Sequence, residues 1–258
     1  MEIIIKVAEM QRIRKHLNYR PNVGFVPTLG GLHEGHLSLS YQSMADNDIT
    51  VMSIFCNPMQ FNDINDLTSY PSDISQDIKY AEQAGVDILF TPNVNEIYKD
   101  DMAYYVDASR KIATVFEGEF RPGHFRGLLT VLIRLFMIVM PNRAYFGMKD
   151  YQQYLLVRDM VQAMFFNIDI IGCPTIRNAD GLPLSSRNKR LSIAGLRDAA
   201  RFSRLLASNQ DNETIKGILI KDGFLVQYIG EIDSRRFGAV VIEGVRIIDN
   251  VDINTIAS

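Results

Sequence analysis

The sequence predicts an α/β domain with a mainly parallel sheet, followed by a smaller α+β C-terminal domain. Two observations predict this organisation. Short β-rich runs alternate with helical runs up to about residue 175, and the alternation then gives way to a polar loop, one helix and glycine-bounded β segments. Hydrophobic residues make up 47% of the 258 residues and charged residues 22%, as in a compact folded protein. The predicted domains are therefore residues 1–175 and 176–258.

The predicted helices have apolar residues three or four apart, and the predicted strands are short runs of β-branched and aromatic residues. In order, the first domain has a helix over 7–17, strand 23–26, helix 35–44, strand 49–55, a helix from Ser72 or Asp73 to Gly85, strand 86–90, helix 127–140, strand 143–146, a helix over 150–164 capped by Asp150, and strand 168–173. The second domain has a helix over 192–206 and β segments over 224–232 and 239–248.

Composition excludes several classes of protein. The net charge of −3 gives no general attraction to nucleic acid or to an anionic membrane, so any anion site must be a local pocket. Residues 128–140 are the most apolar stretch, but they are shorter than the about 20 residues of a membrane span and contain Arg134. The N-terminus does not resemble a secretory signal, so a cytoplasmic protein is expected. Cys56 and Cys173 follow strand-like residues, which favours buried free thiols over a disulfide or a nucleophile.

A glycine-rich turn, residues 27–36, leaves the 23–26 strand and enters a helix. In an open α/β sheet, ligands collect beyond the carboxyl ends of the strands, where a helix N-terminus favours phosphate. His33 and His36 can donate to phosphate oxygens. Two alternatives are a metal-binding pair, which the spacing of His33 and His36 also suits, and two surface histidines in a loop. No third metal ligand has a convincing spacing. The His-x-Gly-His turn directly after a strand favours nucleotide binding over both alternatives.

Two further loops carry polar side chains. After the 49–55 strand, Asn57 and Gln60 offer amides suited to hydroxyls and a carboxylate, although Asn57 before a proline also suits a plain turn. The loop over 117–127 holds Arg121 and His124 among turn residues, and it is equally consistent with a solvated loop.

The segment 145–153 again joins a strand to a helix. Lys149 offers a positive charge to phosphate, Asp150 an acceptor for ribose hydroxyls, and Gln153 shares a helix face with Asp150. Farther along, Ser185, Ser186 and Arg187 provide two hydroxyls and a guanidinium, a set able to hold a triphosphate. A polar linker between domains is the alternative for this last segment.

Together these segments resemble the pantothenate synthetase family, within the Rossmann-like nucleotidyltransferase superfamily that carries the His-x-Gly-His motif. The resemblance covers about residues 23–192 and rests on five ordered segments, PTLGGLHEGH, SIFCNPMQF, EGEFRPGHFRG, RAYFGMKDYQQ and DGLPLSSRN. The sequence departs from the commonest family pattern at Leu29, Cys56 and Met148, where Met, Val and Glu are usual. None of these departures removes a group that the chemistry needs.

The resemblance implies a Rossmann-like parallel sheet domain with a smaller α+β C-terminal domain that acts as a lid, in a cytoplasmic homodimer. It implies that pantoate and β-alanine are joined at the expense of ATP, with Mg²⁺ carried on the ATP phosphates and no metal held by the protein alone. The implied catalytic residues are His33, His36, Lys149 and Arg187. The implied ATP-binding residues are Leu29, Gly30, Gly31, Leu32, His33, Glu34, Gly35, His36, Gly147, Met148, Lys149, Asp150, Ile176, Leu184, Ser185, Ser186 and Arg187. The implied pantoate-binding residues are Gln60 and Gln153, with Asn57, Arg121 and His124 nearby.

Two other functions compete with this one. Another nucleotidyltransferase, such as a cytidylyltransferase, shares the His-x-Gly-His turn but leaves Gln60 and Gln153 unexplained. A nucleotide-binding protein without catalytic activity predicts the loss of some phosphate-facing side chains, whereas the full set is present. No partner is expected beyond the small-molecule substrates and a second copy of the chain, and neither nucleic acid nor a membrane is among the expected partners.

Overall fold

The computed structural model describes residues 1–17, 21–71 and 73–255. The chain divides into two compact units. The first comprises Met1–Met148 and Gln152–Cys173, and the second comprises Lys149–Tyr151 and the chain from Pro174 onward. Lys149 and Asp150 therefore pack with the C-terminal residues, although only Met148 separates them from a strand of the first unit.

The first unit is built on a parallel six-stranded sheet. Its strands are β1 (Glu2–Ile4), β2 (Val23–Thr28), β3 (Ile49–Ile54), β4 (Ile88–Phe90), β5 (Arg143–Gly147) and β6 (Asp169–Cys173), in the spatial order β1-β4-β3-β2-β5-β6. The order reverses at β2, which lies between β3 and β5. The predicted parallel α/β sheet is confirmed, and β2 and β3 end side by side, with Thr28 opposite Ile54.

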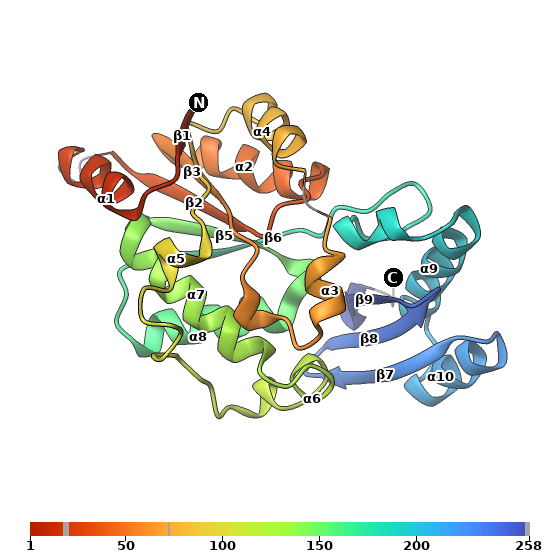
Figure 1. Ribbon diagram of the computed structural model, residues 1–258. Coiled ribbons are helices and arrows are strands. Elements are labelled where there is room, and N and C mark those ends of the chain that lie inside the picture. The colour runs from red at the N-terminus through yellow and green to blue at the C-terminus, as the bar shows by residue number, and fades with distance from the viewer. Residues whose placement is uncertain (18–20, 72, 256–258) are drawn as a thin grey trace. The chain divides into compact units, whose positions relative to one another are not determined.

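Helices cover both faces of this sheet, as Figure 1 shows. On one face lie α1 (Val7–His16), α7 (His124–Val139) and α8 (Tyr151–Ala163), and on the other lie α2 (Glu34–Asp46) and α4 (Ile74–Gln83). Neighbouring strand residues alternate between the two cores: Phe25 packs with α7 residues and Val26 packs with α2 residues. Burial on both faces explains why these strands are continuous apolar runs.

The helix predicted over 127–140 begins earlier than expected. Its first residue is His124, directly after Gly123, whose left-handed φ of 83° allows the sharp entry. The preceding segment also contains a short helix, α6 (Glu117–Phe120). The segment for which a solvated loop was the alternative is thus largely helical, and both Glu117 and His124 are buried.

Several elements, most of them short, were not predicted from the sequence. They are β1, α3 (Ile64–Thr68), α5 (Val94–Ile97), α6, α10 (Asn212–Lys221) and the 3₁₀ turns η1 (Pro58–Gln60), η2 (Lys111–Ala113), η3 (Met148–Asp150), η4 (Ser186–Arg190) and η5 (Ile253–Thr255). Of the two residues expected to start α4, Asp73 caps the helix by accepting from the Gln76 N–H, and Ser72 lies outside the described residues. Asp150, predicted as the cap of α8, is instead the last residue of η3, which leads directly into α8. The helical backbone therefore already begins at Met148.

The second unit packs α9 (Ile193–Leu206) and α10 against an antiparallel sheet of β7 (Leu225–Ile232), β8 (Arg235–Ile242) and β9 (Val245–Asp252). This confirms the α+β prediction for the C-terminal part. The β segment predicted over 239–248 is in fact parts of two strands. Glu243 and Gly244 both have positive φ, 52° and 76°, and they form a two-residue hairpin turn that reverses the chain.

Candidate active site

The glycine-rich turn leaves the carboxyl end of β2 and is held by a buried carboxylate. Gly30 and Gly31 have φ values of 89° and 65°, which glycine adopts without strain. Asp77, on α4 and only 3% exposed, accepts from the N–H of Gly31 at 2.9 Å and of Leu32 at 2.7 Å. A side chain at Gly30 would place its Cβ 3.0 Å from Asp77 Oδ2. Asp77 therefore holds the turn in shape through two of its backbone N–H groups.

His33 follows as the N-cap residue of α2. Its Nδ1 accepts from the Gly35 N–H at 3.1 Å, so the neutral ring carries its proton on Nε2. The His36 ring lies beside it, with the centroids 4.1 Å apart and the planes inclined by 34°. Both imidazoles thus gather at the N-terminus of α2, where the helix dipole favours an anion.

Asn57 and Gln60 lie beyond the end of β3, in and before η1, and both are buried. Asn57 Oδ1 accepts from the Met59 N–H and the Tyr98 hydroxyl, and Asn57 Nδ2 donates to the Gly127 carbonyl. These partners fix the orientation of the amide, because a backbone N–H only donates and a carbonyl only accepts. Nδ2 therefore also donates to Gln60 Oε1, at 3.1 Å, and Gln60 presents its Nε2 donor on the other side.

Arg121 and His124 support the same loop. His124 Nδ1 donates to the Gln60 carbonyl at 2.9 Å, so in the neutral ring Nε2 is the acceptor, and it accepts from Arg121 Nη1 at 3.0 Å. Arg121 also reaches the Gln60 carbonyl at 3.4 Å and lies 3.5 Å from the Glu117 carboxylate. Both ring nitrogens of His124 are engaged within the protein, which favours a supporting role over direct contact with a ligand.

Two adjacent glutamines, Gln152 and Gln153, lie in the first turn of α8, and they have different surroundings. Gln152 is buried, donates to the carbonyls of Ile112 and Val115, and accepts from the Glu117 N–H. It therefore anchors the segment that leads into α6. Gln153, the predicted pantoate ligand, is only partly buried. Met148, the first residue of η3, lies over β6, where a Cβ on Gly172 would fall 2.7 Å from the Met148 Sδ.

The remaining predicted phosphate ligands belong to the second unit. Lys149 Nζ lies 3.7 Å from Asp150 Oδ1, and the Lys149 carbonyl accepts from Asn250 Nδ2 at 2.7 Å. Ser185 caps η4 by accepting from the Arg187 N–H, and Ser186 is buried. Leu184 and Ile176 face each other through a 2.9 Å backbone hydrogen bond, which brings the predicted adenine contact onto the same loop as the serines.

Both cysteines are free thiols, as predicted, but only Cys173 is fully buried, whereas Cys56 is partly buried. Burial raises the pKa of Cys173 to about 11. Burial, together with the charge of Asp66, also raises the pKa of Cys56. A raised pKa keeps each thiol protonated near neutral pH, so neither is suited to act as a nucleophile.

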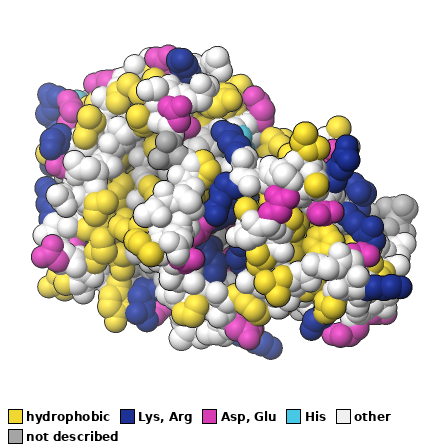
Figure 2. Space-filling view, turned by 45° about the vertical axis from the view of Figure 1, so that its right-hand side comes forward, with side chains coloured by type: hydrophobic (Ala, Val, Ile, Leu, Met, Phe, Trp, Pro, Cys, Tyr) yellow, Lys and Arg dark blue, Asp and Glu magenta, His cyan; other side chains and the backbone are white. Residues whose placement is uncertain are grey.

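Charge is distributed without a dominant basic surface on the face shown in Figure 2, where Lys and Arg side chains are interspersed with Asp and Glu. Across residues 1–17, 21–71 and 73–255, no helix has the length and apolar character needed to cross a membrane. The same residues contain no cluster of three or more His, Cys, Asp or Glu side chains placed to hold a metal ion.

Comparisons with known proteins decide the family. Residues 2–252 match the profile of pantoate-beta-alanine ligase. The chain belongs to the pantoate-beta-alanine ligase family. It is 46% identical to pantothenate synthetase of Coxiella burnetii (strain RSA 331 / Henzerling II), over 97% of this chain and 96% of that protein. It is 44% identical to pantothenate synthetase of Legionella pneumophila (strain Corby), over 97% of this chain and 99% of that one.

Solved structures of this ligase family have the same fold. The pantoate-beta-alanine ligase of Francisella tularensis, crystallised with beta-gamma ATP and beta-alanine, superposes with a TM-score of 0.94 at 40% identity and covers 98% of both chains. Pantothenate synthetase of Thermus thermophilus gives 0.91 at 36% identity, over 98% of this chain and 99% of that one. The expected ligase family and the Rossmann-like fold are thus confirmed.

Proposed function

We propose that this chain condenses (R)-pantoate with β-alanine to pantothenate, using ATP, through a pantoyl adenylate and with release of AMP and pyrophosphate. The observation that carries the proposal is the fixed amide of Gln60. Its oxygen is held by Asn57, so its Nε2 donor is offered beside the end of β3, next to the strand whose following turn bears His33 and His36. The Francisella tularensis relative, crystallised with beta-gamma ATP and beta-alanine, supports the substrates.

A carboxylate acylates an amine poorly because its leaving group would be oxide. In the proposed first step, a pantoate carboxylate oxygen attacks the α-phosphorus of ATP in line, the bond to the β-phosphate oxygen breaks, and pyrophosphate leaves. In the second step, the amine of β-alanine attacks the acyl carbon and AMP leaves with the electron pair of the broken C–O bond. No protein nucleophile is needed, in keeping with the protonated cysteines. Positioning and charge stabilisation are the protein's contributions.

Pantoate is proposed to lie between Gln60 and Gln153, with Asn57, Arg121 and His124 holding the Gln60 loop in shape. An amide N–H suits a carboxylate or hydroxyl oxygen, and its burial makes the hydrogen bond more selective than it would be in water. Asn57, 0% exposed, is fixed by protein groups on both sides of its amide. The loop is therefore organised before the substrate arrives, which lowers the entropic cost of binding.

ATP is proposed to lie along the turn from Leu29 to His36, with phosphates near His33, His36, Lys149 and Arg187. His33 would donate from Nε2, because its Nδ1 caps α2. His36 is the proposed group for proton transfer or leaving-group stabilisation. The other proposed ATP contacts are Gly30, Gly31, Leu32, Glu34, Gly35, Gly147, Met148, Asp150, Ile176, Leu184, Ser185 and Ser186. Mg²⁺ would arrive on the ATP phosphates and neutralise part of their charge.

Localisation and assembly are proposed from the family resemblance alone. A cytoplasmic homodimer is expected, and light scattering on the purified protein should give a mass twice that of one chain. The lid role of residues 176–258 also stays a prediction.

The direct test is to mix the purified protein with ATP, Mg²⁺, pantoate and β-alanine and to analyse the products by mass spectrometry. AMP and pantothenate should appear in equal amounts, and omission of any one substrate should abolish pantothenate. CTP in place of ATP separates this proposal from a cytidylyltransferase. A protein that binds ATP but forms no pantothenate would contradict the proposed activity.

A further inference from the structure

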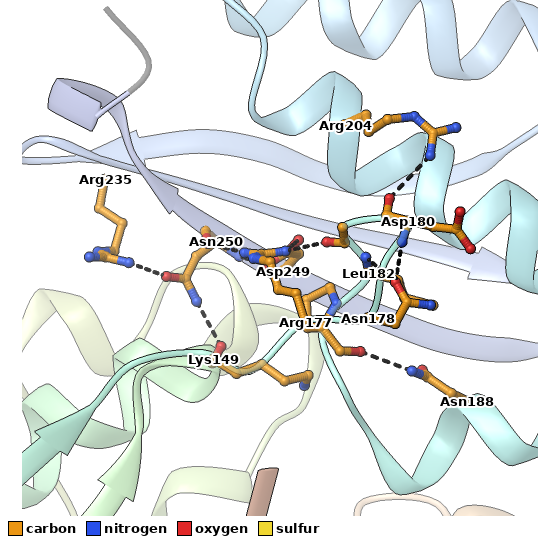
Figure 3. Close-up of polar contacts among 12 residues, drawn as sticks. Lys149, Arg177, Asn178, Asp180, Leu182, Asn188, Arg204, Arg235, Asp249 and Asn250 are labelled. Carbon is orange, nitrogen blue, oxygen red and sulfur yellow. Dashed lines mark hydrogen bonds and ion pairs between the residues drawn. The ribbon is translucent and has the colours of Figure 1, made fainter. Parts of the chain in front are cut away.

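Strand β9 carries two adjacent buried polar residues, Asp249 and Asn250, which are 2% and 4% exposed. The proposed function uses neither of them. Each makes side-chain contacts with a different segment of the second unit (Figure 3). Asn250 contacts Lys149, and Asp249 contacts the loop that precedes the Ser185–Ser186–Arg187 segment.

The Asn250 amide can take only one orientation. Its Oδ1 accepts from Arg235 Nη1 at 2.5 Å, and a guanidinium has no acceptor to offer. Its Nδ2 therefore faces the Lys149 carbonyl and donates to it at 2.7 Å. Arg235 itself lies over the ring of Tyr151, 4.2 Å from the centroid. The Lys149–Tyr151 segment is therefore held by Asn250 at Lys149 and by Arg235 at Tyr151.

Asp249 holds the other segment. Its two carboxylate oxygens accept from Arg177 Nη1 at 2.7 Å and Nη2 at 2.8 Å, a bidentate geometry that fixes the guanidinium plane. Arg177 Nη1 also donates to the Gly181 carbonyl, which closes the loop on itself. The loop continues to Pro183, whose carbonyl accepts from Asn188 at 2.9 Å, on the far side of the serines.

We infer that Asn250 is a positioning residue that sets the backbone of Lys149 for its contact with the ATP phosphates. Asp249 does the same for the loop that carries Ser185, Ser186 and Arg187, so one strand aligns both sets of phosphate-binding groups. The inference rests on the proposed function of Lys149. It assigns a role in ATP use to a part of the chain that lies outside the five recognised segments.

The substitution Asn250→Asp tests this with little change of shape. An aspartate keeps an acceptor for Arg235 but removes the donor and sets an oxygen against the Lys149 carbonyl. Asn254→Asp makes the same chemical change four residues along, at an exposed position, and serves as the control. The double-mutant cycle compares the wild-type protein, Asn250→Asp, Lys149→Ala and the double variant that carries both substitutions. Asn254→Asp is measured beside them.

The readouts are pantoate-dependent exchange of pyrophosphate into ATP, ATP affinity by calorimetry, and the thermal midpoint. Asn250→Asp should lower the exchange rate about tenfold or more in the wild-type background and less than about threefold in the Lys149→Ala background, because the two residues act as one unit. The KM for pantoate should stay unchanged. Asn254→Asp should behave like the wild type.

An equal loss in both backgrounds, or a loss no larger than that of Asn254→Asp, would overturn the inference. If Asn250→Asp does not fold, Asn250→Ala enters the same cycle, since it removes the amide without adding charge. If the wild-type protein makes no pantothenate, that result contradicts the proposed function but not this inference. The coupling between Asn250 and Lys149 in ATP affinity would still decide the inference.

Discussion

Asn57 donates from its side-chain amide to Gln60 Oε1 across 3.1 Å, and this hydrogen bond decides which end of the Gln60 amide faces outward. The donor end is offered, which suits the oxygens of a hydroxy acid. Tyr98 completes the arrangement from the C-terminal end of α5 by donating to Asn57 Oδ1 at 2.7 Å. In the proposed complex, recognition of pantoate would therefore depend on a chain of buried side chains, Tyr98, Asn57 and Gln60, rather than on one glutamine.

Replacing Gln60 or Gln153 by Ala should weaken pantoate use by about 1–3 kcal/mol in kcat/KM, because each change removes a proposed hydrogen bond to a substrate oxygen. ATP binding should change little. Gln162→Ala, at an exposed position on α8, is the matched control. Steady-state kinetics with each substrate varied in turn measure the effect. A loss confined to ATP affinity would show that these residues serve the other substrate.

Gly127 allows α7 to pack against η1. A Cβ at this position would lie 2.3 Å from the Met59 carbonyl oxygen, so Gly127→Ala must displace the loop that carries Gln60. We expect a loss of stability of about 1–3 kcal/mol from this overpacking and a raised KM for pantoate. Gly217→Ala, in α10, meets nothing within 4 Å and should be neutral or stabilising. Denaturant unfolding and kinetics on both variants check this, and unchanged pantoate kinetics in Gly127→Ala would refute it.

Asp77 should act on ATP through the shape of the glycine-rich turn. Asp77→Ala leaves the N–H groups of Gly31 and Leu32 without their acceptor, which costs about 1–3 kcal/mol for each buried group, and ATP affinity should fall. Asp73→Ala removes the cap of the same helix and should cost about 1 kcal/mol of stability without a specific effect on ATP. Calorimetric titration with ATP, alongside thermal unfolding, separates the two. Equal losses of ATP affinity in both variants would mean that Asp77 only stabilises α4.

Met148 and Lys149 are adjacent in the sequence, but substitutions at the two positions should have effects of very different size. The Met148 sulfur lies over Gly172, and the family resemblance implies that a Glu is tolerated at this position. Met148→Glu should therefore change kcat/KM for ATP by less than about tenfold, or about 1.4 kcal/mol. Lys149→Ala should cost on the order of 10²-fold or more, because it removes a cation from developing negative charge. Steady-state kinetics on both variants provide the test. The reverse order would place Met148, not Lys149, against the nucleotide.

Much of the fold could be predicted from the sequence because its pattern is local. Phe25 and Phe146 each lie in a short apolar strand, and α4 and α7, which come between these strands in the sequence, have apolar residues at helical spacing. The three-residue β1 and the hairpin at Glu243 and Gly244 could not be predicted, because short runs and a turn within a β-rich stretch leave weak local signals.

The candidate site was only partly predictable, for a similar reason. Gln60 and His33 stand in recognisable loops, but Asp77 reaches the glycine-rich turn from a helix 46 residues farther along the chain. Its only signal was an acidic residue next to Ile78 and four positions before the buried Ala81. Tyr98 likewise contacts Asn57, 41 residues away, and Gln152 contacts Ile112, 40 residues away. A local sequence pattern cannot predict such contacts.

Exchange of labelled pyrophosphate into ATP tests the central claim most directly, because it reports the reversible formation of an adenylate before β-alanine takes part. The purified protein is incubated with ATP, Mg²⁺ and labelled pyrophosphate, with pantoate and β-alanine each present or absent. Label should enter ATP when pantoate is present and β-alanine is absent, and it should not do so without pantoate. Exchange that strictly requires β-alanine would contradict a pantoyl adenylate intermediate.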